Sequence, residues 1–478
     1  MEPKRIDLPA SSVLLVTCFA SSVVQLDVTI VNVALRRIGS QLGVGVNELQ
    51  WVVNAYTLAF AVLLLSAGAF GDRWGSRRTF IVGMQLFALA SLACGLAPTI
   101  DALNLARAVQ GAGAALLVPS SLAQLRHAAV GDARTLARSV TIWAAVGGAS
   151  FAAGPVIGGF LLATWGWPSI FFVNIPACML GLALASRALR ETPSGAGRSF
   201  DWLGQGLAAL GLVGLVGGSM ELHARSALHP LVVAALAIGA VCLAAFLWVE
   251  SRTRDPVLPL NLFRDARVSV SIGFGITINL TYCGAIFILS LYLQSVLGYS
   301  PVQAGLAFIP LTATFVVANL VSGRLLALAG PALPLVAGGA VAALGYALLI
   351  PLDGESTFLE MLPGFLLIPA GMGTTVPAIM SATLAGARTS AAGTASATLN
   401  AARQVGGALG VALFGSLLGQ GAGPDIVWAL HVTGWASAAL LACAAGVAAL
   451  LWPSLAHLGS NPESAETAVR SETALSQD

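Results

Sequence analysis

Long apolar runs separated by short polar segments make up almost the whole chain. Each run is about 20 residues or longer, which is enough to cross the roughly 30 Å hydrocarbon core of a bilayer as an α-helix. None shows the alternation of polar and apolar residues that marks the strands of a membrane barrel. We count fourteen such runs, at approximately 11–35, 50–71, 79–97, 101–122, 138–160, 168–188, 202–221, 229–250, 268–296, 303–328, 332–352, 358–380, 393–420 and 428–452. The pattern predicts an all-α membrane protein with fourteen transmembrane helices.

The composition agrees with a membrane protein that has little mass outside the bilayer. Of the 478 residues 57% are hydrophobic and 9% are charged, whereas soluble domains carry about 25% charged residues. The net charge of +2 comes without a basic patch, so we expect no nucleic-acid partner. The six cysteines stand singly and no phosphate-binding Gly-Lys-Ser/Thr loop is present, so we expect no metal, cofactor or ATP hydrolysis. Too little polar chain remains for a catalytic domain, and we do not expect an enzyme.

Positive charges indicate the orientation. If the N-terminus is cytoplasmic, 18 of the 23 Lys and Arg residues fall on the cytoplasmic side of the fourteen runs. The positive-inside rule then places both termini in the cytoplasm, in a multi-pass protein of the cell membrane. Linker-like segments at 189–201 and 251–267 bracket the seventh and eighth runs. The predicted parts are a six-helix half at 1–190, two additional helices at 191–250, a second six-helix half at 251–453 and a disordered cytoplasmic tail at 454–478.

Short similarities occur at equivalent places in the two predicted halves. Gly111–Pro119 in the fourth run (GAGAALLVP) is similar to Gly371–Pro377 in the twelfth (GMGTTVP). Val146–Gly159 in the fifth run is similar to Val405–Gly415 in the thirteenth, since both begin with Val-Gly-Gly-Ala. Two repeated halves with a binding site between them are typical of transporters.

Asp27 is an acid deep inside the first apolar run. A carboxylate there costs about 2.5–3.5 kcal/mol on insertion scales, and such residues normally face a protein interior or a water-filled cavity. We expect Asp27 to titrate or to bind a ligand. The alternative is a hydrogen-bonded acid with a structural role.

Arg107 and Gln110 share one face of the fourth run because they are three residues apart. Counting residues from the ends of the runs places Asp27 and Arg107 in the same outer half of the membrane. We therefore predict proton exchange at an Asp27–Arg107 pair, in which protonation of the acid favours one conformation. A permanently paired structural bridge is the alternative. The predicted polar cluster consists of Asp27, Asn32, Asn54, Tyr56, Arg107 and Gln110.

Two glycine-rich segments are candidates for conformational gating. The loop GAFGDRWGSRR between the second and third runs is a candidate latch for the inward-closed state, because an acid stands among its glycines and arginines. A basic loop that only fixes topology is the alternative. In the fifth run, glycines around a proline predict a pivot between the halves, with simple small-residue packing as the alternative. The candidate gating residues are Gly68, Asp72, Arg73, Gly75, Arg77, Gly154, Pro155, Gly158 and Gly159.

Arg403 lies in the thirteenth run, and no acid occurs inside the second-half runs to pair with it. An anionic substrate, helix carbonyls and cytoplasmic water are its three alternative partners. Isolated polar side chains in other runs can add neutral contacts, although helix–helix hydrogen bonds are their commoner role. The predicted substrate cavity consists of Asn32, Asn54, Tyr56, Gln110, Asn279, Tyr282 and Arg403.

Several of these segments resemble the major facilitator superfamily, and specifically its fourteen-span drug:proton antiporter family. The segments that carry the resemblance are Leu26–Leu35, Gly68–Arg78, Arg107–Gly113, Gly154–Gly159, Tyr299–Gly305 and Asn400–Gln404. The resemblance implies that Arg107 takes part in proton coupling. It also implies that the protein is an antiporter, because the Gly154–Gly159 motif resembles one associated with antiporters. The chain departs from the family pattern at Arg36, where Pro is common, and at Ser150, where Gly is common. It also lacks the second-half membrane acids that some exporters of this family use for divalent cationic drugs. This absence favours substrates that are monovalent cations, neutral molecules or anions.

The combined prediction is a proton-coupled antiporter that exports small amphipathic organic compounds, such as drugs, antibiotics or secondary metabolites, by alternating access. A proton-coupled importer or facilitator of a small metabolite is the alternative, and a non-transporting membrane sensor or scaffold is a third reading. The expected partners are a small-molecule substrate, protons and the lipid bilayer. We expect the protein to work as a monomer.

Overall fold

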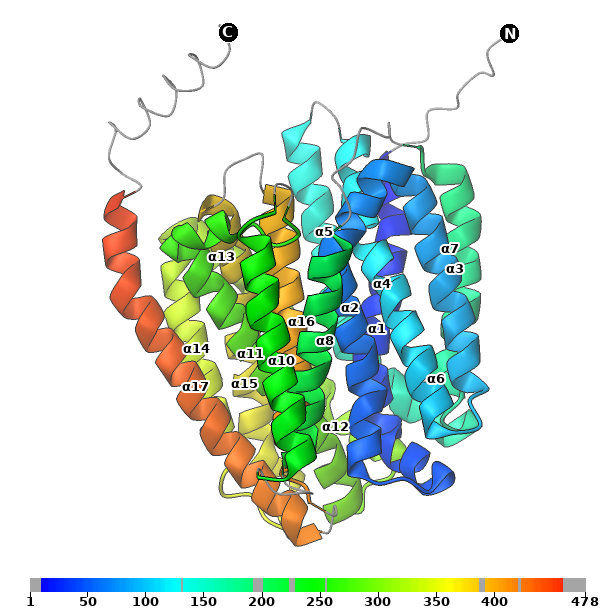
Figure 1. The fold of residues 1–478 in the computed structure, drawn as a ribbon. Helices are drawn as coiled ribbons and strands as arrows, with labels where there is room; N and C mark the ends of the chain where they lie inside the picture. Colours follow the sequence, from blue (N-terminus) through cyan, green and yellow to red (C-terminus); the bar gives the residue numbers. More distant parts are fainter. Residues whose placement is uncertain are drawn as a thin grey trace, which may run out of the picture.

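A computed structural model describes residues 10–129, 132–191, 201–222, 228–253, 256–386, 392–419 and 423–458. Within these ranges the regular structure is helical and no strand occurs. The long helices run side by side along a common axis (Figure 1). Of the tail predicted at 454–478, residues 454–458 form the end of the last helix, and the remainder lies outside the described residues.

The first group of helices packs into one bundle. Helix α1 packs along α5, and α4 packs on both α2 and α3. The members are α1 (Ala10–Leu42), α2 (Val46–Trp74), α3 (Ser76–Gly95), α4 (Ile100–Ala128), α5 (Ala133–Trp165), α6 (Ser169–Phe172) and α7 (Asn174–Ala188).

The second group repeats this arrangement with the later helices. Helix α11 packs along α16, and α15 packs on both α13 and α14. The members are the 3₁₀ turn η1 (Leu260–Arg264), α11 (Ala266–Leu291), the π-helical turn η2 (Tyr292–Val296), α12 (Pro301–Ala307), α13 (Ile309–Ala329), α14 (Ala332–Ala347), α15 (Phe358–Gly386), α16 (Ala392–Ser416) and α17 (Gly423–Leu458).

A helical hairpin lies at the seam between the two groups. It consists of α8 (Trp202–Met220) and α10 (Pro230–Glu250), which pack along each other. Helix α8 also contacts α2 of the first group and α16 of the second, and the apolar cluster at this seam includes Leu58, Val216 and Ala412. The hairpin therefore bridges the two groups on one side of the molecule.

Each of the fourteen apolar runs overlaps one helix or two consecutive helices. The sixth run covers α6 and α7, the ninth covers α11 and η2, and the tenth covers α12 and α13. Within the described residues, ten helices are long and apolar enough to cross a membrane. The number rises to eleven if the two parts of α5, which are bent by 42°, form one span. The sequence count of fourteen therefore exceeds what length and composition alone support.

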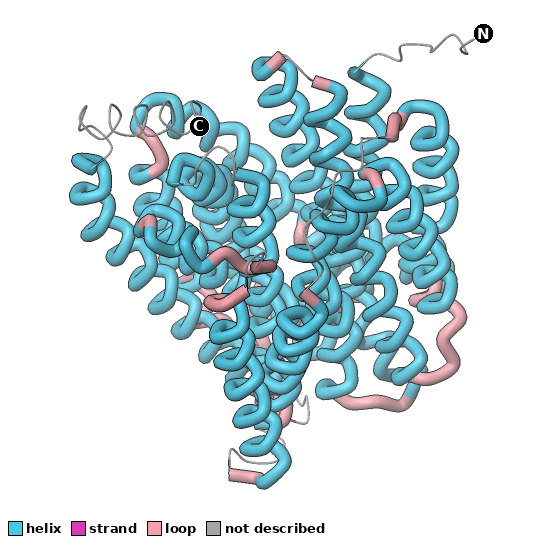
Figure 2. The backbone as a smooth tube through the Cα atoms, turned by 45° about the horizontal axis from the view of Figure 1, so that its top comes forward, coloured by secondary structure: helices cyan, strands magenta, loops and turns pink. Residues whose placement is uncertain are grey.

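Helix α1 begins and α17 ends at the same end of the bundle, which we call the terminal end (Figure 1). Figure 2 brings the terminal end forward and shows the helices of the two groups drawing together away from it. Gly159 of α5 marks one such contact, because a Cβ added there would lie 2.5 Å from the carbonyl oxygen of Pro301 in α12. Only a glycine allows the two backbones to come so close.

Hydrogen bonds also join α1 to α11 and η2 at the end opposite the terminal end. The Ser290 hydroxyl donates to the carbonyl of Asn32 at 2.9 Å, and the Gln294 amide donates to that of Val33 at 3.1 Å. In the other direction, the Arg36 guanidinium donates to the carbonyl of Gln294. The two groups are therefore held together at this end in the present conformation.

Candidate functional site

Asp27 of α1 and Arg107 of α4 form an ion pair inside the first group. Both side chains are fully buried, at 0% exposed, and an Arg107 guanidinium nitrogen donates directly to Asp27 Oδ2. Arg107 Nε donates to the backbone carbonyl of Val52 at 2.9 Å. A second ion pair joins Arg78 and Glu191 at the surface. The structure thus brings together the two residues whose depths the sequence matches.

Two amides and a hydroxyl complete the surroundings of the Asp27 carboxylate. Gln110 and Asn174 each donate to Asp27 Oδ1, at 2.9 and 2.8 Å. The Ser91 hydroxyl oxygen accepts from both amides, at 2.7 and 3.4 Å. Gln110 in turn accepts from Arg107 at 2.7 Å. The carboxylate is therefore held by donors from α4 and α7, and a closed polar network links four helices.

Aromatic rings enclose the Arg107 guanidinium. Its Cζ lies 4.3 Å from the ring centroid of Tyr56 and 5.8 Å from that of Phe171. Guanidinium Nη2 has no hydrogen-bond partner, so the ring faces provide its remaining stabilisation. Buried charges are tolerated when they are paired and hydrogen-bonded, and removing one partner of such a pair costs about 3–5 kcal/mol.

Two members of the predicted polar cluster form no hydrogen bond with the Asp27 network. Asn32 is five residues beyond Asp27, which places it on a different face of α1. Its amide donates to the carbonyl of Thr29 in its own helix, at 3.2 Å. Neither polar atom of the Asn54 side chain has a hydrogen-bond partner. Matching depth does not fix the direction of a side chain around its helix, so a functional role for Asn32 and Asn54 stays a prediction.

Conversely, the sequence argument missed Ser91 and Asn174. Asn174 is the one amide inside the sixth apolar run, in the segment FFVNIPACM. A lone amide at that point carries the same kind of signal as Asn54, so only the fold distinguishes a cluster member from a residue outside it.

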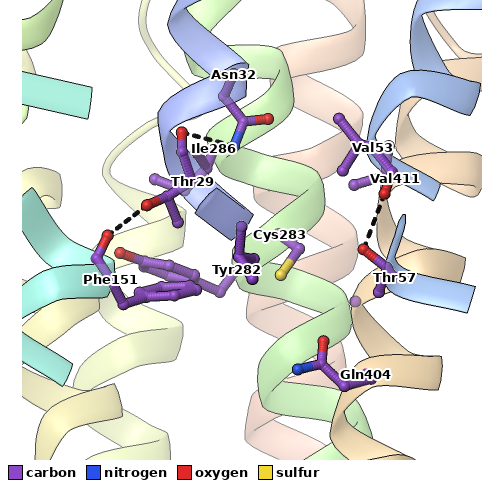
Figure 3. A pocket seen from close by; sticks show the side chains of 12 residues that line it. Thr29, Asn32, Val53, Thr57, Phe151, Tyr282, Cys283, Ile286, Gln404 and Val411 are labelled. Carbon is purple, nitrogen blue, oxygen red and sulfur yellow. Dashed lines mark hydrogen bonds between the residues drawn. The ribbon is translucent and has the colours of Figure 1, made fainter. Parts of the chain in front are cut away.

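A small cavity lies between the two groups, where α1, α2, α5, α11 and α16 meet (Figure 3). Its volume of about 20 Å³ is enough for one water molecule. The rings of Phe151 from α5 and Tyr282 from α11 stack at its edge, with centroids 5.7 Å apart and an angle of 29° between the planes. The polar side chains of the lining belong to Thr29, Asn32, Thr57, Tyr282, Cys283 and Gln404.

The predicted cavity residues divide into three sets. Asn32 and Tyr282 line the cavity, whereas Tyr56 and Gln110 belong to the Asp27 network. Asn54, Asn279 and Arg403 are not part of the lining. Asn279 donates to the carbonyl of Gly275 in its own helix at 3.2 Å. The sequence argument missed the hydroxyls and the phenylalanine, because such residues are common in membrane helices that only pack.

Pro155 explains one of the contacts in Figure 3. A proline has no backbone N–H, so the carbonyl of Phe151, four residues earlier in α5, receives no helical hydrogen bond from it. The hydroxyl of Thr29 donates to this carbonyl instead, at 2.5 Å. The proline thus creates an acceptor in α5 that α1 uses.

The glycines around Pro155 are contact points. A Cβ on Gly154 would lie 2.0 Å from Thr29 Oγ1, and one on Gly158 would lie 2.8 Å from the carbonyl oxygen of Ile30. Gly159 faces α12 of the other group instead. The structure therefore shows close packing on both sides of α5, and the pivot remains a prediction.

The loop between α2 and α3 is attached to its own group. Gly75 has φ +88°, and a Cβ there would lie 1.9 Å from Glu191 Oε1. Arg77 Nη2 donates to the carbonyl of Ser186 in α7 at 3.3 Å. These contacts of Gly75 and Arg77 stay within the first group, and a latch between the two groups remains a prediction.

The other candidate latch residues are less constrained. No atom lies within 4 Å of the position a Cβ would take on Gly68. The Arg73 side chain is exposed, and the Asp72 side chain lies outside the described residues. A gating role for these residues remains a prediction.

Comparisons with known proteins agree on one family. Residues 17–411 match the family model described as Major Facilitator Superfamily. The chain is 36% identical to Multidrug resistance protein Stp of Mycobacterium tuberculosis over 393 residues, which cover 82% of this chain and 73% of that protein. It is 34% identical to the Tetracenomycin C resistance and export protein of Streptomyces glaucescens over 414 residues, which cover 86% of this chain and 76% of that protein.

A solved structure supports the same fold. It is that of a bacterial homologue of the human drug peptide transporters PepT1 and PepT2, with a TM-score of 0.64 and 16% sequence identity. The match covers 94% of this chain and 100% of that chain. At this identity the likeness concerns the fold alone.

Proposed function

Because the chain belongs to the major facilitator superfamily, we propose that it is a proton-coupled antiporter that exports small amphipathic organic compounds, such as drugs, antibiotics or secondary metabolites, by alternating access. Family membership makes it a multi-pass membrane transporter and not an enzyme, as the sequence predicts. Export is supported by the two relatives above, whose names state drug resistance or export.

The proposal includes fourteen spans. Helices α2, α14 and α16 are further helices of the bundle, and adding them to the eleven spans above gives fourteen. An even number of spans is supported by α1 beginning and α17 ending at the same end of the bundle. We take the terminal end as cytoplasmic because most of the basic residues fall in its loops. The functional parts are then the half at 1–190, the inserted hairpin at 191–250 and the half at 251–453, in a monomer of the cell membrane.

The buried Asp27–Arg107 pair is the observation that carries proton coupling. An ionised Asp27 neutralises Arg107 and accepts hydrogen bonds from Gln110 and Asn174. A proton on the carboxylate removes its charge and one acceptor position, so Arg107 loses its anionic partner. The network that joins four helices then has a different lowest-energy arrangement. Protonation can therefore favour one of two conformations of the transporter.

Helix α1 links this proton site to the substrate cavity. Asp27 and Thr29 are two residues apart, so they point to roughly opposite sides of α1. Thr29 lines the cavity and Asp27 lies in the polar network. A rotation or shift of α1 on protonation would therefore change the cavity lining directly. We propose Asp27 and Arg107 as the coupling pair, and the cavity between the groups as the centre of the substrate site.

Gating follows from the contacts at the outer end. Arg36 and Gln294 join α1 to η2 there, and these contacts must break when the outer side opens. The loop at Gly68–Arg78 would hold the cytoplasmic side closed in that outward-open conformation. The same exchange of closed ends underlies alternating access in transporters built of two halves.

Asp27→Asn in the full-length chain tests the coupling. The chain is reconstituted in proteoliposomes with an imposed pH gradient, and uptake of a fluorescent, uncharged amphipathic dye and internal pH are recorded together. We expect proton-driven dye movement to fall to the level of empty liposomes, because an amide cannot take up the proton. Asp101→Asn, which changes an exposed acid in the first turn of α4, should retain transport. Normal proton-driven transport by Asp27→Asn would overturn the proposal.

The direction of transport needs a separate measurement. Deleting an exporter raises the amount of substrate inside cells, whereas deleting an importer lowers it. We therefore expect cells without the protein to accumulate more dye, and cells that carry Asp27→Asn to resemble them. Lower accumulation in the deletion strain would favour the importer alternative.

A further inference from the structure

Arg403 is a half-buried cation in the middle of α16 that forms no ion pair with a described residue. Its Nε is buried and makes no hydrogen bond. Neither of the two ion pairs in the described part of the chain includes Arg403. Its aliphatic stem packs on α11, since a Cβ added to Gly275 would lie 3.2 Å from Arg403 Cγ. The side chain is therefore anchored, but its charge is not neutralised by the protein.

The described acids of the second group cannot supply that neutralisation. Asp265 caps α11 and accepts from the backbone N–H of Arg267 at 2.8 Å. It stands ten residues before Gly275, which corresponds to about 15 Å along the helix. The remaining described acids of this group lie toward the opposite end of the bundle, and they are Asp353, Glu355, Glu360 and Asp425. The missing anion is thus not part of the described protein.

Arg403 lies next to the cavity between the two groups. Gln404, its neighbour in α16, lines that cavity (Figure 3). The guanidinium is also within electrostatic range of the Cys283 thiol, which lines the cavity from α11. Since α16 begins at the terminal end, Arg403 lies on the terminal side of the lining residues of that helix. A compound that arrives from the terminal side would meet this cation before the stacked rings.

We infer that Arg403 binds the negatively charged group of the substrate, and that the exported compounds are aromatic organic acids such as carboxylates and acidic phenols. This inference rests on the proposed export function and names its substrate class. A guanidinium presents parallel donors that match a carboxylate, and charge-assisted bonds of this kind are the strong ones. The rings of Phe151 and Tyr282 offer an apolar surface for the aromatic body. A cationic compound would be repelled by Arg403, since no acid stands beside it.

A matched pair of fluorescent probes tests the charge preference. Dansylglycine carries a carboxylate, and dansylglycinamide has the same aromatic body without the charge. Binding of each is measured by dansyl fluorescence with the full-length chain in nanodiscs. We expect the wild-type chain to bind the carboxylate at least about tenfold more tightly than the amide. Arg403→Gln should reduce the preference to within about twofold, and Arg403→Lys should retain part of it. Arg324→Gln, which removes an exposed arginine of α13, should leave the preference unchanged.

The result can contradict the inference in two ways. A wild-type chain that does not prefer the carboxylate, or that binds neither probe, overturns it. So does an Arg403→Gln chain that keeps the full preference, because the guanidinium would then face helix carbonyls or cytoplasmic water. Retained amide binding shows that the variant is folded, and Arg403→Lys supplies a second variant if the glutamine chain is unstable. Proton-driven dye transport by the wild-type chain reports on the export function separately, so the two proposals fail independently.

Discussion

The two halves of this transporter each carry an arginine inside a long helix, and the surroundings of the two side chains differ: Arg107 is fully buried, whereas Arg403 is half-buried. In the first half Arg107 bonds to an acid, an amide and a backbone carbonyl, and it lies against two aromatic rings. In the second half the buried Nε of Arg403 has no partner. The protein therefore neutralises the charge of Arg107 with its own carboxylate and supplies no such partner to Arg403 among the described residues.

The two proposals above assign different tasks to the two arginines. In the first half, a single proton on Asp27 would change the charge balance of a closed network. In the second half, a negatively charged ligand would neutralise Arg403. Helix α1 connects the two sites, because its two sides carry Asp27 and the cavity residue Thr29. Under these proposals, proton and substrate would compete through the position of α1 and would need no common binding group.

Breaking the first pair should have the largest effect. Arg107→Gln leaves Asp27 buried without its cation, and the free energy of unfolding should fall by about 3–5 kcal/mol at neutral pH. The double variant with Asp27→Asn should recover most of that loss, because it removes the orphaned charge as well. Thermal unfolding of the detergent-solubilised single and double variants measures this. Losses that simply add up would show that the two side chains do not form one unit.

Giving the second arginine an acid should have the next largest effect. Cys283 lies near the Arg403 guanidinium, so Cys283→Asp places a carboxylate where the anionic substrate would bind. We expect the preference for dansylglycine over its amide to fall about tenfold, since the new acid competes for the same cation. Cys283→Ser is the matched control and should keep the preference. An unchanged preference in Cys283→Asp would argue that the two halves do not differ as described.

The outline of this fold could be predicted from the sequence because lipid imposes a strong pattern. Fourteen apolar runs overlap helices, and counting residues from their ends was enough to pair Asp27 with Arg107. Depth along a helix follows from residue number alone. The absence of an acid partner for Arg403 could also be predicted, because acids are rare inside these runs.

The rest of the site could not be predicted, since it depends on how each helix is rotated. Asn54 and Asn174 look alike as lone amides in apolar runs, yet only Asn174 reaches Asp27. Phe151 and Thr29 are residues of kinds common in membrane helices, and the sequence does not mark them. Only the fold shows that the Phe151 ring stacks on Tyr282 of α11 and that the Thr29 hydroxyl bonds to α5, both beside the cavity. Length and composition alone also do not give fourteen spans, in part because α14 is a short helix of 16 residues.

A moderate effect is expected from Asn174, which belongs to the proton network but carries no charge. Asn174→Ala removes one of the donors that stabilise the ionised form of Asp27. The network then holds the carboxylate with one amide donor fewer, so we expect the initial rate of proton-driven transport to fall, but by less than in Asp27→Asn. Proteoliposome transport under an imposed pH gradient measures this rate. Asn319→Ala changes an amide that bonds to the Phe315 carbonyl of its own helix, and its rate should match the wild type.

The smallest effect concerns the contact that joins α1 to α5 beside the cavity. Thr29→Val removes the hydroxyl that donates to the Phe151 carbonyl, and Pro155 cannot donate in its place. We expect a loss of about 0.5–1.5 kcal/mol in the free energy of unfolding, with Thr29→Ser close to wild type.

Pro155→Ala provides the check on this last explanation, because alanine restores a backbone N–H that can reach the Phe151 carbonyl. In a chain that already carries Pro155→Ala, Thr29→Val should cost little, since the carbonyl keeps a helical partner. The double-mutant cycle isolates the interaction between the two positions from their separate effects on packing. Equal costs of Thr29→Val in both chains would mean that the proline does not create the acceptor that α1 uses. A coupling close to the full cost would instead tie the helix that carries the proton site to the glycine-rich helix that contacts the other half.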